Sequence, residues 1–224
     1  MRDIRTLVLE FKDEVTAANG KIRSKAPGKG VLNAAISSLL FRYLESKGIK
    51  THFIEYDGSR SLIVHKLEMI PLEVILRNYA YGSQIKRMPF LKPLQPLNSP
   101  LFELHLKDDE LGDPLILPED ALAAGILTPQ ELKSLKSLAY EINSYLTEFF
   151  ESKGLKLIDI KLEFGKNENN EIILGDELNG DVFRVINERG EHLDKEIYRK
   201  TQNVEFLLKA YKELAKRLGI GIEL

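Results

Sequence analysis

The strand-like run 157–165 is the feature that most restricts how this chain can fold. Its polar residues Asp159, Lys161 and Glu163 alternate strictly with apolar residues. Successive side chains of a β-strand point to opposite faces, so the run predicts one charged face and one core face. Taken alone, this pattern favours an ordinary antiparallel strand whose outer face is half solvated and carries mixed charges.

A second strand-like run, 172–175, follows a short polar turn and ends just before Asp176 and Glu177. An antiparallel hairpin would bring these carboxylates to the same end of the sheet as Glu163, next to a glycine that permits close approach of a ligand. Mg²⁺ prefers a few carboxylates together with phosphate oxygens, and Lys161 can offset the remaining phosphate charge. The hairpin therefore predicts a Mg-nucleotide site rather than a stand-alone metal site.

Composition excludes several classes of protein. The 224 residues include 32 Lys and Arg and 34 Asp and Glu, a formal charge of −2. No overall basic field is available to attract nucleic acid or an anionic membrane. The absence of cysteine excludes disulfides and thiolate zinc sites and suits a reducing compartment. No apolar run approaches the ~20 residues of a membrane helix, and residues 1–14 resemble no targeting peptide, so we expect a cytoplasmic location.

Hydrophobic periodicity predicts a mixed α+β fold with antiparallel sheets and packed helices. The expected helices cover about 32–44, 128–154 and 203–218, and the expected strands cover 6–11, 51–56, 61–68, 155–164 and 171–175. The segment 12–30 holds five basic residues between chain breakers and is interpreted as a basic, mobile loop. We divide the chain into a small N-terminal lobe, 1–78, and a larger C-terminal lobe, 79–224, with a cleft between them.

The apolar run 69–83 contains two charged residues, Glu73 and Arg77, which would not be buried unpaired. One interpretation is a structural ion pair between them. The other is a phosphate anchor, because Gly82-Ser83 and the basic residues after it supply backbone and side-chain donors. Spacing favours neither interpretation, so both are kept.

The acidic run 107–114 has a similar ambiguity. A solvated loop is the ordinary interpretation of such a run. In the alternative interpretation, the carboxylates of this run orient an amine of a ligand while Lys107 binds an anion. The four histidines are scattered along the chain and are given no chemistry.

Several stretches now combine into one resemblance. The two longest are Met69–Ser83 and Ile158–Gly165. The shorter ones are Phe11-Lys12-Asp13, Thr16-Ala17, Asn19-Gly20, Gly28-Lys29-Gly30, Lys107-Asp108-Asp109, Gly175-Asp176-Glu177 and Leu193-Asp194-Lys195. Taken in their order along the sequence, these stretches closely resemble the SAICAR synthetase family over nearly the whole chain from Val8 onward. The resemblance implies two α+β lobes with ATP between them, related to kinase and ATP-grasp architectures.

The resemblance also implies an activity. It is that of an ATP-dependent ligase of purine biosynthesis, which joins L-aspartate to the carboxylate of carboxyaminoimidazole ribonucleotide and gives SAICAR, ADP and phosphate. The implied partners are these small molecules, without nucleic acid or membrane, and a homodimer is considered for the assembly.

The same resemblance implies roles for individual residues. Glu163 and Asp176 would hold the Mg²⁺ of Mg-ATP, and Lys161 would contact a phosphate. The backbone of Lys66, Leu67, Glu68 and Met69 would bind adenine. Arg77, Ser83 and Arg184 would bind the phosphate of the nucleotide substrate, with Lys107, Asp159 and Arg199 nearby. The catalytic candidates are Lys161, Asp159 and Lys107.

The chain also departs from the family pattern. Family members begin with a strand, a Gly- and Lys-rich turn and a second strand that cover the ATP phosphates, and Met1 falls after this hairpin. We therefore expect weak ATP binding unless basic residues fold over the nucleotide, namely Lys21, Arg23, Lys25 and Lys29. Tyr81 stands where a small residue is usual, Asn179-Gly180 replaces Ser-Pro, and Val185-Ile186-Asn187 replaces Leu-Trp-Asp.

Two alternatives to the ligase follow. A small-molecule kinase would use the same cleft but stop after phosphoryl transfer, so its ADP release would not require aspartate. A degenerate nucleotide-binding paralogue would keep the fold without turnover. The absent hairpin favours this second alternative, and the retained carboxylates oppose it.

Overall fold

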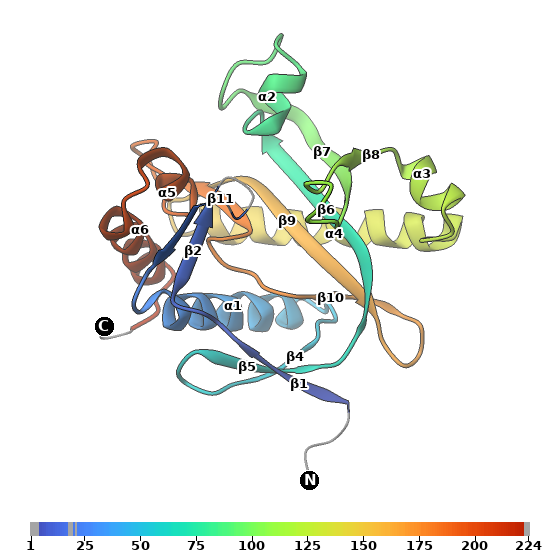
Figure 1. The fold of residues 1–224 in the computed structure, drawn as a ribbon, viewed down its shortest axis with the longest axis horizontal. Coiled ribbons are helices and arrows are strands. Elements are labelled where there is room, and N and C mark those ends of the chain that lie inside the picture. Colours follow the sequence, from blue (N-terminus) through green and yellow to red (C-terminus); the bar gives the residue numbers. More distant parts are fainter. Residues whose placement is uncertain (1–4, 18–19, 21, 222–224) are drawn as a thin grey trace.

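In the computed structural model, which describes residues 5–17, 20 and 22–221, one long strand of the main sheet pairs with three others (Figure 1). This strand, β9 (Lys156–Lys166), pairs antiparallel with β6 (Glu68–Tyr79) along one edge. Its other edge pairs with β10 (Ile172–Gly175) and then with β11 (Phe183–Ile186). The sheet continues beyond β6 with β7 (Pro96–Leu106) and β8 (Leu115–Ile116).

The loop 176–182 lies where β10 gives way to β11 along β9. Gly175, the last residue of β10, is opposite Glu163, whereas Phe183, the first residue of β11, is opposite Ile160. Between them the backbone N–H of Lys161 donates to Val182 across 2.8 Å. The loop is therefore held beside the middle of β9, where the charged side chains of that strand begin.

A second, smaller sheet contains the N-terminal strands in the order β1-β5-β4. Its strands are β1 (Thr6–Glu10), β4 (Phe53–Tyr56) and β5 (Ser61–His65), and helix α1 (Lys29–Ser46) contacts β4 and β5. The turn at Asp57-Gly58 closes the predicted hairpin. β6 then carries the chain from this sheet into the main sheet (Figure 1).

The segment 12–30, which we expected to be a mobile loop, contains a third, two-stranded sheet instead. It consists of β2 (Glu14–Ala17) and β3 (Ile22–Lys25), paired antiparallel. The apolar side chains Val15 and Ala17 are buried against Leu207 and Tyr211 near the C-terminus. The basic residues of this segment favoured a loop, but its few apolar residues anchor it to the rest of the protein.

The helices predicted from apolar periodicity are confirmed. Helix α4 (Pro129–Glu151) packs against β9 and β6, and α6 (Val204–Arg217) contacts α1 and α5 (Glu196–Thr201). Two short helices, α2 (Ser83–Arg87) and α3 (Pro118–Ala123), lie at the ends of the segments that project from the sheet (Figure 1). Among the described residues, no helix has the length and apolar character needed to cross a membrane.

The α+β architecture agrees with the sequence prediction. A continuous apolar core extends from α1 and the small sheet through the main sheet to α4. The proposed lobe boundary between residues 78 and 79 falls near the end of β6. The division into lobes 1–78 and 79–224 stays a prediction.

The start of α4 provides a test of local stability. The Thr128 hydroxyl accepts a hydrogen bond from the Glu131 backbone N–H at 3.2 Å, and the Glu131 carboxylate accepts one from the Thr128 N–H at 2.8 Å. Replacing such a capping hydroxyl leaves a helix N–H without its partner, so Thr128→Ala should lower the free energy of unfolding by about 1 kcal/mol.

Urea denaturation measures this loss. The matched control is Ser134→Ala, which removes a hydroxyl from an exposed position of the same helix. It should change the free energy of unfolding by less than about 0.5 kcal/mol. Equal effects of the two substitutions would show that the cap contributes nothing specific.

Candidate active site

A cavity of about 360 Å³ lies over the charged face of β9. Six of the residues singled out from the sequence line it: Arg77, Ser83, Asp159, Lys161, Arg184 and Arg199. A second cavity, of about 330 Å³, is lined by Lys29 and Asp176 and shares Asp181 with the first. The two cavities therefore meet at the loop 176–182, which brings most of the candidate residues to one region.

Glu163 is held by two lysines in this region. Lys161 donates to one of its carboxylate oxygens at 3.2 Å, and Lys107 forms an ion pair with the other. Lys161 also donates to Glu73 at 2.5 Å. Glu163 is buried; burial raises the pKa of its carboxyl, but the charges of Lys161 and Lys107 outweigh this and lower it. The same two carboxylates raise the pKa of Lys161 although burial opposes them.

Asp176 follows β10 and has a left-handed backbone, with φ of 57°. This conformation is uncommon for a residue with a side chain and persists where surrounding contacts impose it. Burial and then the charge of Glu163 raise the pKa of the Asp176 carboxyl. The Asp176 carboxyl group therefore lies close enough to Glu163 for their charges to repel each other, and Lys107 and Lys161 partly offset this repulsion.

The carboxylates of Glu163 and Asp176 fit as ligands of a Mg²⁺ ion that also binds a nucleotide. Glu163 and Asp176 supply hard oxygen ligands from neighbouring strands, and a cation would relieve the repulsion that raises the Asp176 pKa. Among the described residues there is no cluster of three or more potential ligands that could hold a metal ion by themselves. The phosphate oxygens of a nucleotide would complete the coordination.

The residues around Glu163 form a first charged group, and a second charged group surrounds Arg77. Its guanidinium is buried and donates to Asp159 at 2.7 Å, to Glu103 at 3.1 Å and to the Ser83 hydroxyl at 3.0 Å. The alternative ion pair between Glu73 and Arg77 is wrong. Four residues of strand separate these side chains by roughly 13 Å, so each finds a partner on a neighbouring strand instead.

Arg184 extends this group from β11. It donates to the Asp159 oxygen that also receives Arg77, at 2.8 Å, and to Glu196 at 3.0 Å. Arg199 lies on the same cavity wall and donates to Glu196 at 3.2 Å. Asp159 and Glu196 therefore orient the arginines, and of this group the three guanidiniums and only one carboxylate, Asp159, line the cavity.

The segment 66–69 lies beside the carboxylates but lines neither of these two cavities. Lys66 and Leu67 link β5 to β6, Glu68 and Met69 begin β6, and the Lys66 backbone N–H already donates to the Arg5 carbonyl at 2.7 Å. A Cβ placed on Gly175 would lie 3.2 Å from Leu67 and 3.4 Å from Met69. The glycine thus allows this segment to approach the residue before Asp176. Lys66 and Leu67 line another cavity, of about 640 Å³.

One charged residue of the site, Glu103, was not predicted from the sequence. Glu103 is buried on β7, where it pairs with both Arg77 and Arg87. Its position between apolar residues of a strand-like run was the available signal. Lys29, which we expected to fold over a nucleotide, is buried in an ion pair with Asp181. Arg23 and Lys25 are exposed on β3, and Lys21 lies outside the described residues.

The Glu103 contacts predict a pH dependence of stability. Burial raises the pKa of Glu103, but the nearby His105 ring and the hydrogen bond from Arg77 outweigh it and lower the pKa from 4.5 to about 2. A lowered carboxyl pKa stabilises the fold above pH 4.5, and this contribution is lost as the pH falls toward 2. Glu103→Gln should cost on the order of 3 kcal/mol at pH 7.

Urea denaturation at pH 7, 5 and 3 compares wild type, Glu103→Gln and the exposed control Glu110→Gln. The difference between wild type and Glu103→Gln should shrink between pH 5 and 3, because over this range Glu103 binds a proton in the unfolded chain while it stays ionised and paired in the folded protein, where its pKa is about 2. The control should track wild type. A difference that stays constant over this range would contradict the assignment.

Comparison with known proteins agrees with this geometry. The family model described as SAICAR synthetase matches residues 1–218. The phosphoribosylaminoimidazole-succinocarboxamide synthase of Caldivirga maquilingensis is 49% identical over 217 residues, which cover 97% of this chain and 90% of that relative.

Solved structures show the same fold. A SAICAR synthetase in complex with ADP matches with a TM-score of 0.94 and 41% identity, over 99% of this chain and 94% of the other. The phosphoribosylaminoimidazole-succinocarboxamide synthase of Ehrlichia chaffeensis matches with a TM-score of 0.94 and 38% identity, over 100% of this chain and 94% of the other. The resemblance drawn from the sequence is confirmed, and the chain belongs to the SAICAR synthetase family.

Proposed function

We propose that this chain uses the two charged groups to join L-aspartate to the carboxylate of carboxyaminoimidazole ribonucleotide, with ATP as the energy source. Membership of the family makes the chain a nucleotide-using ligase of purine biosynthesis. The observation that carries the proposal is the meeting of the Glu163–Lys161 group with the Arg77–Asp159–Arg184 group over one face of the sheet. The first group suits Mg-nucleotide, and the second suits an anionic substrate.

The nucleotide end is assigned to the residues around Glu163. Glu163 and Asp176 would hold Mg²⁺, and Lys161 would contact a phosphate, while the backbone of 66–69 would bind adenine. When bound, Mg²⁺ offsets the negative charge that the phosphoryl group carries during transfer. The approach of Leu67 and Met69 to Gly175 supports this arrangement, because it brings the adenine segment next to the carboxylates.

The ribonucleotide end is assigned to the arginine group. Arg77, Arg184 and Arg199 would bind the substrate phosphate with Ser83, because a guanidinium presents two parallel donors to phosphate oxygens. Asp159 accepts from both Arg77 and Arg184 and fixes their orientation. Lys107 and Lys161 would lie near the carboxylate that reacts, since both already pair with a carboxylate in this cleft.

The chemistry then takes two steps. A substrate carboxylate oxygen attacks the γ-phosphorus of ATP, which forms an acyl phosphate and releases ADP. The aspartate amine next attacks the acyl carbon, the bond to phosphate breaks, and the amine loses a proton as the amide forms. In both steps the protein mainly positions reactants and stabilises negative charge, the role for which Lys161, Lys107 and Asp159 are proposed.

The remaining parts of the assignment rest on the chain as a whole. Small molecules are the proposed partners, and the site needs neither nucleic acid nor a membrane surface. The absence of cysteine from the sequence supports a cytoplasmic location. A homodimer stays a prediction that sedimentation analysis can test.

The activity itself is the first test. Purified protein supplied with Mg-ATP, aspartate and carboxyaminoimidazole ribonucleotide should form SAICAR, ADP and phosphate in equal amounts, as measured by chromatography. ADP release should require aspartate. ADP release at the full rate without aspartate would indicate the kinase instead, and nucleotide binding without turnover would indicate the degenerate paralogue.

The metal assignment predicts the effect of removing either ligand. Glu163→Gln and Asp176→Asn keep the shape of the side chain but remove its charge, so each should lower kcat on the order of 10²–10³-fold. Circular dichroism should show an intact fold, and the control Glu55→Gln, at an exposed position of β4, should turn over normally. Normal turnover of both site variants would remove these residues from the metal site.

A further inference from the structure

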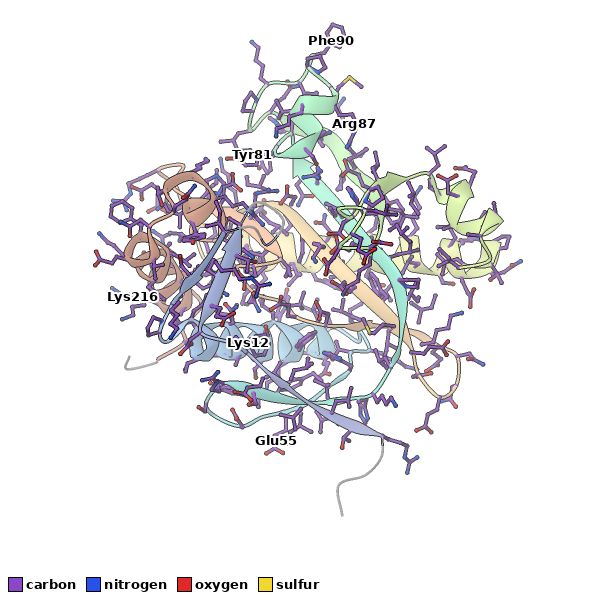
Figure 2. All side chains as sticks on the ribbon, in the orientation of Figure 1. Lys12, Glu55, Tyr81, Arg87, Phe90 and Lys216 are labelled. Atoms are coloured by element: carbon purple, nitrogen blue, oxygen red, sulfur yellow. The ribbon has the colours of Figure 1, made fainter. Side chains whose placement is uncertain are left out.

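Tyr81, which has no role in the assignment above, lies at the base of the projecting segment that carries α2 (Figure 2). Its ring centroid is 5.3 Å from the Cζ atom of Arg184 and 5.4 Å from Nζ of Lys200. An aromatic ring attracts a cation placed over its face. Tyr81 is therefore in contact with one of the arginines proposed to bind the ribonucleotide phosphate.

The hydroxyl of Tyr81 begins a chain of hydrogen bonds. It lies 3.1 Å from Nε2 of His192, and Nδ1 of His192 lies 3.0 Å from a carboxylate oxygen of Asp194. In the tautomer whose Nδ1–H donates to Asp194, Nε2 of His192 accepts a hydrogen bond from the Tyr81 hydroxyl. His192 and Asp194 are both buried, so this series of hydrogen bonds fixes the rotation of the Tyr81 ring.

Asp194, the last residue of this series of hydrogen bonds, is linked to Arg184 in two ways. One Asp194 oxygen accepts from the backbone N–H of Val185 at 2.9 Å, next to Arg184. The other accepts from the N–H of Glu196 at 2.7 Å, and the Glu196 carboxylate in turn receives Nε of Arg184. The side chain and the backbone of Arg184 are thus tied to the same buried carboxylate that holds Tyr81 through His192.

The guanidinium needs this contact because its hydrogen bonds fix it incompletely. Asp159 and Glu196 receive Nη1 and Nε, which lie in the guanidinium plane and leave the plane free to tilt. The Tyr81 ring and the Gly82 backbone restrict that tilt. A Cβ on Gly82 would lie 3.2 Å from Nη1 of Arg184, so a side chain there would displace the group.

Arg184 also retains donor capacity for a ligand. Across the described part of the chain, its Nη2 donates no hydrogen bond, and Arg184 lines the 360 Å³ cavity together with Arg77, Ser83 and Arg199. Tyr81 is not part of the wall of that cavity. Its effect on a substrate would therefore be transmitted through Arg184.

We propose that Tyr81 is a positioning residue for the ribonucleotide phosphate, because its ring and its hydrogen bond to His192 hold the Arg184 guanidinium in the orientation that binds this anion. The inference rests on the proposed function, which places the phosphate beside Arg184. It adds a residue that selects for the phosphorylated form of the substrate.

Two substitutions separate the ring from the hydroxyl. Tyr81→Leu removes the aromatic face and should raise the KM for the ribonucleotide on the order of 10-fold, as expected for a partly desolvated cation–π contact. Tyr81→Phe keeps the ring but loses the bond to His192 and should raise the same KM about 3-fold. The KM values for ATP and aspartate and the value of kcat should stay near those of wild type.

The matched control is Tyr140→Phe. The Tyr140 hydroxyl donates to the Pro100 carbonyl at 3.2 Å, away from the arginine group, so its removal measures the general effect of losing a tyrosine hydrogen bond. This variant should keep the wild-type KM for the ribonucleotide. A rise equal to that of Tyr81→Phe would show that the Tyr81 effect is general destabilisation, and would overturn the proposal.

The decisive comparison uses the ribonucleoside that lacks the phosphate. Without the phosphate, Arg184 has no anion to orient toward, so wild type and Tyr81→Leu should have equal kcat/KM for the ribonucleoside. The same penalty for both substrates would show that Tyr81 does not act through the phosphate and would overturn the proposal.

Calorimetric titration with the ribonucleotide alone separates this inference from the proposed function. Tighter binding to wild type than to Tyr81→Leu supports the positioning role even if no ligation occurs, in which case only the proposed reaction fails. Equal binding to the two proteins, or no binding to wild type, overturns the positioning role whatever the ligase assay shows.

Discussion

The register between β6 and β9 is the constraint on which the site depends. It places Glu73 opposite Glu163, Ile75 opposite Lys161 and Arg77 opposite Asp159. Directly opposed residues of an antiparallel pair share a face, so this register gathers the charges of both strands on one side of the sheet. A slip of one residue would turn the β6 charges toward the core face, where α4 packs. Burying unpaired charge is costly, and the register is therefore strongly selected.

The same register creates a conflict that Lys161 resolves. Two glutamates directly opposite each other repel, and both Glu73 and Glu163 are buried. Lys161 donates to both, at 2.5 and 3.2 Å, so one ammonium group compensates two carboxylates. Lys161 therefore stabilises the pairing of the strands as well as serving as a proposed phosphate contact. Its removal would affect folding and function together, which makes the carboxylate variants the cleaner probes.

Local pattern predicted the elements but not the partners. The alternation in 157–165, the return of 172–175 and the apolar periodicity of α4 each depend on neighbouring residues, and the structure contains all three elements. The charged face of β9 was expected to be half solvated, yet Asp159 and Glu163 are buried, because loop 176–182 and long side chains from other strands cover them.

The ion-pair partners on neighbouring strands could not be predicted from the spacing of residues along the sequence. Arg77 pairs with residues 26 and 82 positions away, and these distances along the chain have no periodic signature. The pairing of Glu73 with Arg77 was considered because the two are close in sequence, but an extended strand keeps them apart. The hairpin within 12–30 was missed for a related reason, since its few apolar residues pack against helices near the other end of the chain.

The two lysines at Glu163 differ in what they can do when substrates arrive. The Lys161 side chain is 28% exposed and holds two carboxylates, whereas the Lys107 side chain is 48% exposed and pairs with Glu163 alone. Lys107 reaches the buried Glu163 carboxylate from its more exposed side and can leave when another cation takes its place, while moving Lys161 would remove the charge that compensates two buried carboxylates. Binding of a cation to Glu163 and Asp176 would replace the charge that Lys107 supplies and free this lysine to follow an anionic substrate. Lys161 would stay in place and keep the two strands compensated throughout the reaction.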